Sequence, residues 1–247
     1  MDLSQLKVKV FADGADKAAM LELHKNPIVK GFTTNPTLMR QAGVSDYRAF
    51  ARDVLQVIRD RPISFEVFSD DFDEMEEQAL EIASWAGNVY VKIPITNTAG
   101  EPSNRLIAKL AAAKVQLNVT AVMTLEQVRS VIPCLAGGPG SYVSLFAGRV
   151  ADTGRDPVPV MKSAVEMLKV HSNIELIWAS PRELLNIFHA DSVGCHIITV
   201  THDVLRKLGL IGKDLAEYSL DTVKMFRTDA LKAGYSLKPS AYRKKAG

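Results

Sequence analysis

The chain has 247 residues, of which 47% are hydrophobic and 23% charged, with a formal net charge of +2. This size and composition suit one globular domain with a large core. Lysines and arginines are spread along the chain without a basic stripe, which argues against a nucleic-acid partner and leaves an anionic small molecule open.

Membrane, secretory and metal-binding signals are not found in the sequence. No stretch reaches the roughly 18 apolar residues of a membrane span, and the first residues lack a basic-then-apolar leader. Cys134 and Cys195 lie far apart and fit no ligand or disulfide pattern, and the histidines form no ligand pair at helical spacing. We therefore expect a cytoplasmic protein without a metal site.

Short apolar or β-branched runs alternate with longer amphipathic runs, which is typical of strand and helix units around a parallel sheet. Helical patterns fill the gaps between the strands, for example 71–85 with its acidic first turn and 157–170 with its opening prolines. Eight strands are expected, with ends placed to within about 2–4 residues, at 7–13, 29–35, 63–68, 89–95, 116–123, 142–149, 174–180 and 196–201.

Eight such units in about 250 residues are what a closed (β/α)₈ barrel requires, so the predicted fold class is α/β, a single-domain TIM barrel. An open doubly wound sheet is the competing architecture, but no Gly-x-Gly-x-x-Gly motif follows the first strand. A further helix is expected at 214–231. We assign residues 1–235, with this helix, to the barrel domain and residues 236–247 to a polar tail.

Lys92 lies within the run from Val89 to Ile95, whose β-branched and aromatic residues indicate a buried strand. Desolvation penalises the ammonium form and favours a neutral amine, which can attack a carbonyl and form a Schiff base. The alternative is an edge-strand lysine whose amine reaches water. Taken alone, the run leaves both readings open.

Other polar residues fall near the carboxyl ends of the predicted strands, where catalytic groups of this fold gather. Each has an ordinary alternative: Asp13 could cap the helix near Asp16, Asn35 could start a helix with Pro36, and Phe146 could belong to the core. Six predicted strands place polar residues at the same end of the barrel, around one desolvated lysine, and this agreement favours a shared site. The candidates are Asp13, Thr33, Thr34, Asn35, Glu66, Asn118, Thr120, Ser144 and Phe146.

Several runs resemble the transaldolase family. The run from Gly31 to Met39 is similar to the family's Thr-Thr-Asn-Pro signature, and Val91-Lys92-Ile93-Pro94 is similar to the segment that carries its Schiff-base lysine. The resemblance covers roughly residues 7–225 in the family's order. Supporting runs lie at 11–13, 118–120, 144–149 and 179–182.

The resemblance implies an enzyme that transfers a dihydroxyacetone unit between sugar phosphates of the pentose phosphate pathway and needs no cofactor. Lys92 would form the Schiff base, and Asp13 would accept and return the proton at the breaking bond. Glu66 and Thr120 would hold a water that serves carbinolamine dehydration. The remaining contacts to the three-carbon unit would come from Thr33, Asn35, Asn118, Ser144 and Phe146.

The resemblance also implies a phosphate site at Arg149, Ser180 and Arg182. Two guanidinium groups fit a phosphate, and we expect Ser180 at the start of the following helix, whose amino end attracts anions. The alternative is that the arginines pair with carboxylates of the protein. The expected partners are Asp152 for Arg149 and Glu183 or Asp191 for Arg182.

Two alternatives to a transaldolase remain at this point. Relatives resembling fructose-6-phosphate aldolase tend to have glutamine at the place of Glu66 and tyrosine at that of Phe146, so this chain favours group transfer over release of free dihydroxyacetone. A sugar-phosphate-binding barrel without turnover is the second alternative. The compact branch of the family forms rings of five that pair into decamers through the C-terminal helix, so we expect a homo-oligomer; that helix could instead pack on its own barrel.

Overall fold

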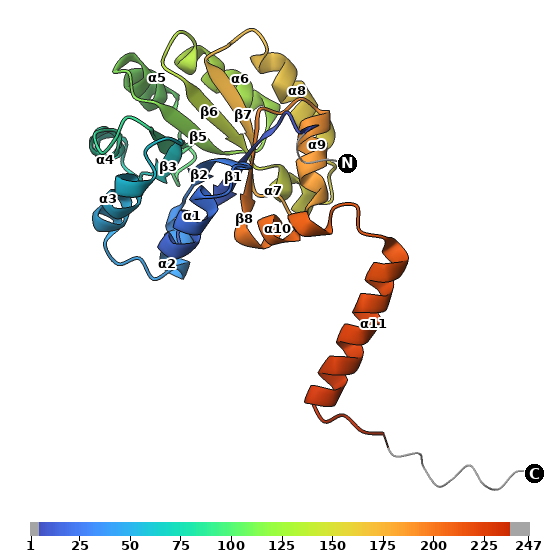
Figure 1. The fold of residues 1–247 in the computed structure, drawn as a ribbon. Helices are drawn as coiled ribbons and strands as arrows, with labels where there is room; N and C mark the ends of the chain where they lie inside the picture. Colours follow the sequence, from blue (N-terminus) through green and yellow to red (C-terminus); the bar gives the residue numbers. More distant parts are fainter. Residues whose placement is uncertain (1–4, 238–247) are drawn as a thin grey trace, which may run out of the picture. The chain divides into compact units, whose positions relative to one another are not determined.

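A computed structural model describes residues 5–237 of the chain. The chain divides into two compact units, one up to Leu208 and the other from Gly209 onward. The first unit is a barrel of strands ringed by helices, and the second contains one long helix (Figure 1). The expected tail at 236–247 lies almost entirely outside the described residues, and the assignment of 1–235 to one domain stays a prediction.

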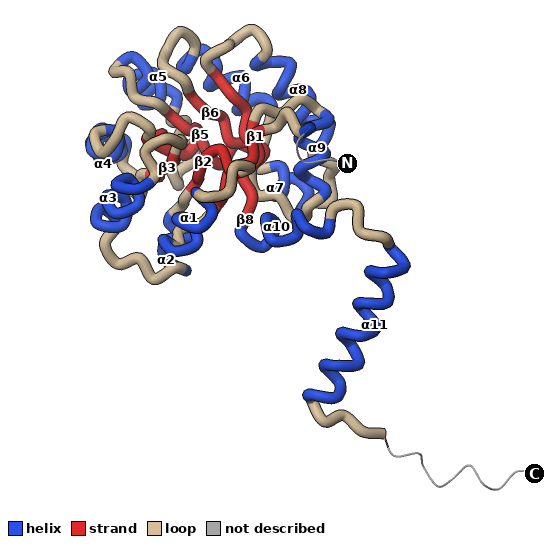
Figure 2. The backbone as a smooth tube through the Cα atoms, in the orientation of Figure 1, coloured by secondary structure: helices blue, strands red, loops and turns tan. Residues whose placement is uncertain are grey.

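Eight parallel strands close into a barrel in which each strand pairs with its neighbour in sequence and the last pairs with the first (Figure 2). The predicted (β/α)₈ fold class is therefore confirmed. The strands are β1 (Lys9–Asp13), β2 (Val29–Thr33), β3 (Ile63–Glu66), β4 (Val89–Pro94), β5 (Leu117–Val122), β6 (Ser141–Leu145), β7 (Ile174–Trp178) and β8 (Ile197–Thr201).

Helices follow the strands and pack around the outside of the barrel (Figure 1). Many begin where a side chain accepts a hydrogen bond from a first-turn amide, as at Asp71 and at the capping box of Thr124 and Gln127. The helices of the barrel unit are α1 (Lys17–His24), α2 (Pro36–Gln41), α3 (Tyr47–Val57), α4 (Phe72–Ala83), α5 (Asn104–Ala112), α6 (Leu125–Leu135), α7 (Ala147–Asp152), α8 (Val158–Leu168), α9 (Leu185–Ser192) and α10 (His202–Arg206).

The second unit contains helix α11 (Leu215–Lys232), which lies close to the predicted 214–231. Asp214 caps it by accepting hydrogen bonds from two first-turn amides. A 3₁₀ turn, η2 (Lys207–Leu210), precedes it in the sequence. Among the residues that the structure describes, no helix has the length and apolar character needed to cross a membrane.

Several predicted strands extend beyond the observed ends, and in two of them the chain turns early into a helix. β2 ends at Thr33 rather than at residue 35, because the Asn35 side chain caps α2 and Pro36 occupies the first turn of that helix. β6 ends at Leu145 rather than at residue 149, because the chain turns at Phe146 into α7. Arg149 therefore lies on a helix and not at a strand end.

Aromatic rings fill the amino-terminal half of the barrel interior. Tyr90 stacks on Tyr142 with ring centroids 4.0 Å apart, and Phe11 meets Tyr142 edge-on at 5.9 Å. Gly31 leaves space for the Phe11 ring, since a Cβ at this position would lie 2.6 Å from its atoms. This aromatic layer closes the barrel at one end.

The next layer of the interior is polar because strand side chains on one face repeat every two residues. Two positions beyond Phe11, Tyr90 and Tyr142 come Asp13, Lys92 and Ser144, in the same order. The rings therefore form a floor beneath a polar layer that faces the carboxyl ends of the strands, which is where this fold builds its sites.

Candidate active site

A cavity of about 500 Å³ lies at the carboxyl ends of the strands. It brings together eleven of the thirteen side chains that the sequence indicates for the site; the exceptions are Thr34 and Asn118. The eleven are Asp13, Thr33, Asn35, Glu66, Lys92, Thr120, Ser144, Phe146, Arg149, Ser180 and Arg182.

Lys92 is buried in β4, with 5% of its surface exposed. Its Nζ lies 3.0 Å from Oε2 of Glu66 and donates a hydrogen bond to the carbonyl oxygen of Thr34 at 2.9 Å. The register of β3 against β4 places Glu66 directly beside Lys92. Because the barrel is closed, β4 has no free edge, and the alternative of an edge-strand lysine is wrong.

Asp13 ends β1 and accepts a hydrogen bond from Oγ1 of Thr33 at 2.7 Å. It does not cap α1; that role belongs to Asp16, which accepts from the amide of Ala19 at 2.7 Å. Burial raises the pKa of Asp13, and the charge of Lys92 and the Thr33 hydrogen bond offset part of this shift. A carboxyl group with a raised pKa suits a role in which it both accepts and returns a proton.

Tyr47, from α3, fixes the main chain at Glu66. Its hydroxyl donates to the Glu66 carbonyl oxygen at 2.9 Å and accepts from the Glu66 amide at 2.8 Å. Phe65 and Trp85 pack against the Tyr47 ring. Burial raises the pKa of Tyr47, which keeps the hydroxyl neutral and able to donate. No pattern in the sequence indicates this contact, because an aromatic residue on a helix usually belongs to the core.

Glu66 is oriented by its strand neighbours as well as by Tyr47. Phe65 and Val67 are buried in the core layer outside the barrel, so Glu66 faces inward and lines the cavity. Its carboxylate pairs with Lys92 rather than with a surface lysine. The predicted internal role of Glu66 is therefore consistent with its position.

Thr120 and Asn118 lie two residues apart on β5 but have different surroundings. Thr120 Oγ1 is buried, lines the cavity and has no hydrogen-bond partner within residues 5–237. Asn118 lies beneath the cavity, where its Oδ1 accepts from Ser144 at 2.7 Å and its Nδ2 donates to Ser64 at 3.0 Å. Asn118 thus orients Ser144 and does not line the cavity, whereas Thr120 has a hydroxyl available for a ligand or water.

The two arginines differ in what they bind. Within the described part of the chain, no hydrogen bond or ion pair engages the guanidinium of Arg149, although the sequence suggested Asp152 as a partner. Asp152 pairs with Arg182 instead, which corrects the expected pairing of Arg182 with Glu183 or Asp191. The cavity therefore has one unpaired guanidinium and one that shares a carboxylate.

The sequence suggested that Ser180 starts a helix, but this is wrong, because α9 begins only at Leu185. It adopts a left-handed backbone with φ of 58°, as does Ala121 with φ of 61°, and both line the cavity. Such backbone strain in non-glycine residues concentrates at functional sites. Gly148 allows α7 to approach this loop, since a Cβ there would lie 1.5 Å from the Ser180 carbonyl oxygen. This close approach brings Arg149 and Ser180 to one side of the cavity.

Sequence reasoning missed two threonines of β8 that also line the cavity, Thr199 and Thr201. Oγ1 of Thr199 lies 2.5 Å from Oγ1 of Thr33, which in turn contacts Asp13. The two threonines alternate with apolar residues at a spacing of two, a pattern that could have indicated an inward face.

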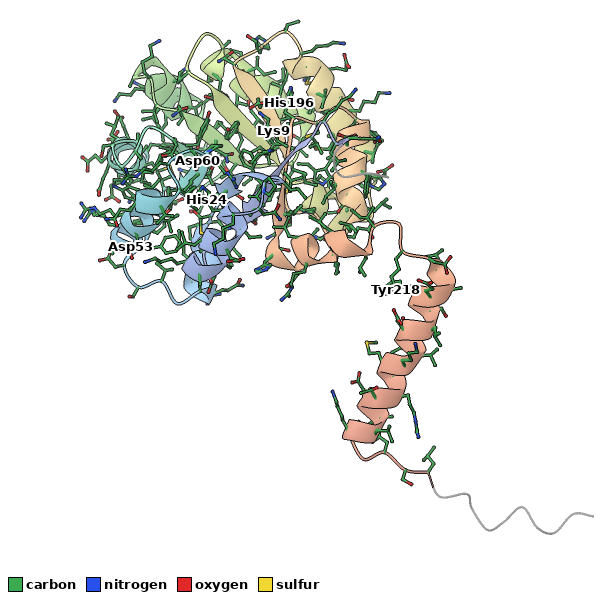
Figure 3. The ribbon with its side chains drawn as sticks, viewed as in Figure 1. Lys9, His24, Asp53, Asp60, His196 and Tyr218 are labelled. Carbon is green, nitrogen blue, oxygen red and sulfur yellow. The ribbon has the colours of Figure 1, made fainter. Side chains whose placement is uncertain are left out.

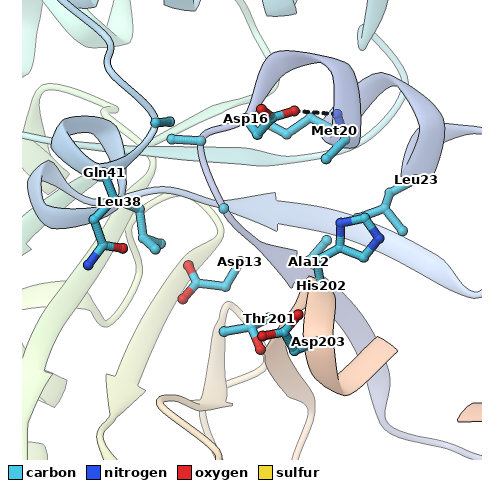
Figure 4. A pocket seen from close by; sticks show the side chains of 14 residues that line it. Ala12, Asp13, Asp16, Met20, Leu23, Leu38, Gln41, Thr201, His202 and Asp203 are labelled. Carbon is cyan, nitrogen blue, oxygen red and sulfur yellow. Dashed lines mark hydrogen bonds between the residues drawn. The ribbon is translucent and has the colours of Figure 1, made fainter. Parts of the chain in front are cut away.

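A second cavity of about 430 Å³ adjoins the first and extends among α1, α2 and α10 (Figure 4). It shares Asp13 and Thr201 with the first cavity, and Asp16 and Asp203 also line it. These carboxylates make this side unfavourable for a phosphate, in contrast to the side that carries the arginines. Among residues 5–237, no cluster of three or more histidine, cysteine or acidic side chains could hold a metal ion.

The barrel and the position of its cavity define the class of protein first: a (β/α)₈ fold with a polar site at the carboxyl ends of the strands. Solved structures share the fold. A putative lyase/mutase from Burkholderia cenocepacia J2315 matches with a TM-score of 0.58 and 13% identity, over 94% of this chain and 86% of that one. A putative phosphonomutase from the same organism matches with a TM-score of 0.54 and 12% identity, over 92% of this chain and 96% of that one.

Sequence comparison then identifies the family. The family model described as Transaldolase/Fructose-6-phosphate aldolase matches residues 10–245. A probable transaldolase of Dehalococcoides mccartyi is 34% identical over 202 residues, which cover 81% of this chain and 90% of that protein. A probable transaldolase of Thermoanaerobacter sp. is 30% identical over 231 residues, which cover 93% of this chain and 100% of that protein. The chain belongs to the transaldolase/fructose-6-phosphate aldolase family, which confirms the resemblance seen in the sequence.

We expect a Tyr47→Phe variant to lower kcat about tenfold with little change in KM, because Glu66 loses both main-chain hydrogen bonds and its carboxylate shifts relative to Lys92. Steady-state kinetics would measure this. Tyr90→Phe is the matched control, since Tyr90 lies in the aromatic floor. An unchanged kcat in Tyr47→Phe, with only a loss of thermal stability, would show that the contact is purely structural.

Proposed function

We propose that this protein is a transaldolase that transfers a dihydroxyacetone unit through a Schiff base on Lys92. The donor would be sedoheptulose 7-phosphate or fructose 6-phosphate, and the acceptor glyceraldehyde 3-phosphate or erythrose 4-phosphate, as in the pentose phosphate pathway. The observation that carries the proposal is a buried lysine beside Glu66, in one cavity with Asp13 and with an arginine, Arg149, that no hydrogen bond or ion pair engages within residues 5–237. Family membership supports it.

Schiff-base formation would begin with loss of a proton from Lys92. Glu66, 3.0 Å from Nζ, is placed to accept it. The neutral amine then attacks the ketone carbon of the donor, and the carbonyl oxygen becomes the hydroxyl of a carbinolamine. A water held between Glu66 and the available hydroxyl of Thr120 would carry the proton that lets this hydroxyl leave as water.

Bond cleavage would follow from the positive charge on the imine nitrogen. Asp13 accepts the proton of the donor's C4 hydroxyl, the bond between C3 and C4 breaks, and its electron pair moves into the iminium to give an enamine. The aldose phosphate departs with the new aldehyde. The enamine then attacks the acceptor aldehyde, Asp13 returns its proton to the new hydroxyl, and water hydrolyses the imine.

The three-carbon unit must stay bound while the aldose phosphates exchange. Ser144 is held by Asn118, so its hydroxyl has a fixed position at the cavity wall. The Oδ1 of Asn35 caps α2, which leaves its amide Nδ2 to donate to a substrate hydroxyl. These contacts support roles for Ser144 and Asn35 in holding the unit, with Asn118 acting one layer below.

The phosphate of each substrate would bind Arg149, Ser180 and Arg182. Arg149 has its donors available, while a phosphate would compete with Asp152 for Arg182. The substrate would therefore stretch from Lys92 in the barrel to helix α7 and the loop after β7.

Intact mass after addition of fructose 6-phosphate and borohydride tests the central step. We expect a reduced three-carbon adduct on the wild type and none on Lys92→Met, since only a neutral lysine amine forms the imine. An exposed lysine substitution, Lys162→Met, should keep the adduct. Peptide mapping of the wild type locates the adduct even if Lys92→Met folds poorly, and an adduct on any other lysine would refute the assignment.

The pH dependence of kcat/KM should report Asp13. Its pKa is raised by burial from an ordinary value of 3.8, and it must be deprotonated to accept the substrate proton. Activity should therefore fall with decreasing pH along a limb that lies above 3.8. Circular dichroism over the same range controls for acid unfolding. A limb at or below the ordinary value, with the protein folded, would contradict this role.

The other activity of the family, release of free dihydroxyacetone, depends in our proposal on the side chain at position 146. Phe146 lines the cavity and packs against the inner aromatic cluster, so it keeps this part of the site apolar. A tyrosine hydroxyl there would add a proton-transfer group near the enamine. Glu66, in place of the aldolase glutamine, also favours transfer.

Phe146→Tyr should therefore raise the ratio of free dihydroxyacetone released to group transferred, at least severalfold. A coupled assay without acceptor, run beside the transfer assay, measures both rates. Phe68→Tyr, at a position outside the cavity, is the control. If Phe146→Tyr gains no aldolase activity, position 146 does not decide between the two reactions.

We further propose that helix α11 joins copies of this chain. It carries Leu220, Val223 and Phe226 at a spacing of three, which gives one apolar stripe. Light scattering after size exclusion should give a mass that is a multiple of five chains, and Val223→Glu with Phe226→Glu should lower it. A monomeric wild type would indicate that α11 packs only on its own barrel.

A further inference from the structure

A third cavity, of about 370 Å³, lies at the opposite end of the barrel from the candidate active site. Its walls come from the amino-terminal ends of strands β1 and β2 and from the segments that precede β3, β4 and β5. The volume falls in the range of small-molecule sites. The residues around it are Lys9, Phe11, Lys30, Arg59, Asp60, Arg61, Pro62, Asn88, Tyr90, Gln116 and Tyr142.

The wall formed by the first three strand units is cationic. Four basic side chains, Lys9, Lys30, Arg59 and Arg61, face one carboxylate, Asp60. His24 lies 2.7 Å from Asp60 and, with Arg61, lowers its pKa. Lys9, His24 and Asp60 are labelled in Figure 3.

Three of the four cations keep donors available for a ligand. Lys9 is bound to Glu175 at 2.6 Å. Arg59 donates through Nε to Gln56. Arg61 donates through Nη1 to Asn26, and its Nε pairs with Oδ2 of Asp60 at 3.7 Å. Within residues 5–237, no hydrogen bond or ion pair engages the remaining guanidinium nitrogen atoms of Arg59 or the ammonium of Lys30.

The rest of the cavity is neutral and partly aromatic. Tyr90 and Tyr142, stacked on one another, form its inner end, and the Tyr142 side chain is buried. Gln116 and Asn88 lie beside them, although both amides already donate to main-chain carbonyls. A ligand with one anionic end and one neutral, hydrogen-bonding end would match the two sides.

We propose that this cavity binds a phosphorylated small molecule, with its phosphate against Lys30, Arg59 and Arg61 and its neutral part over Tyr90 and Tyr142. Guanidinium groups with free N–H donors are strong phosphate ligands. The site is separate from the candidate active site, because the aromatic floor lies between them.

Isothermal titration with inorganic pyrophosphate, at low and at physiological salt, tests this site. The wild type is compared with Lys30→Ala/Arg59→Ala and with Arg149→Ala/Arg182→Ala, which removes the proposed catalytic phosphate contacts. We expect the Arg149/Arg182 variant to keep one binding event. In the Lys30/Arg59 variant, the affinity of that event should fall about tenfold or more. Both Lys30 and Arg59 are exposed, so the fold should survive their replacement.

A variant with the same change of charge, Lys162→Ala/Lys169→Ala, controls for general electrostatics, since neither lysine lines the cavity. Loss of all binding in Arg149→Ala/Arg182→Ala would overturn the proposal. So would unchanged binding in Lys30→Ala/Arg59→Ala, or an equal loss in the Lys162/Lys169 control. Retained transaldolase turnover in Lys30→Ala/Arg59→Ala would show that the loss is local to this end of the barrel.

Discussion

The ion pair between Lys92 and Glu66, inside a closed barrel, is the interaction on which the rest of this site depends. A buried charge is costly without a partner, and removal of one member of a buried pair typically costs about 3–5 kcal/mol. The register of β3 against β4 sets the two side chains beside one another, and Tyr47 holds the main chain at Glu66. In the proposed mechanism, the pair keeps the amine of Lys92 inside the protein together with a carboxylate that would take its proton.

The barrel divides its interior between packing and chemistry. Aromatic rings from β1, β4 and β6 lie in the amino-terminal half, and the next residue on the same face of each of these three strands is polar. Asp13 is thus buried deeply enough to raise its pKa while it remains beside the cavity. The charges around the two adjoining cavities differ: Arg149 lines the first, and the carboxylates of Asp16 and Asp203 line the second. A sugar phosphate that reaches Lys92 would accordingly point its phosphate toward α7.

The sequence predicted the barrel well because its signal is local and repeated: buried strands read as apolar runs, and parallel strands align their carboxyl ends. The same logic gathered Lys92, Asp13 and Glu66. This reasoning failed where contacts between residues far apart in the sequence determine the position of a side chain. Asn118 lies beneath the cavity because Ser64 and Ser144 hold it, and Asp152 pairs with Arg182 because Gly148 lets α7 approach the loop after β7. Tyr47 reaches the main chain of Glu66 from helix α3, and Thr199 of β8 contacts Thr33 of β2, so no local pattern predicts either contact.

A crystal structure of the protein soaked with fructose 6-phosphate tests the account most directly, because it shows the chemistry and the orientation of the substrate together. We expect continuous density from Nζ of Lys92 to the second carbon of the sugar, with Asp13 beside the C4 hydroxyl and the phosphate between Arg149 and Arg182. A sugar bound without a covalent bond, with its phosphate away from both arginines, would contradict it.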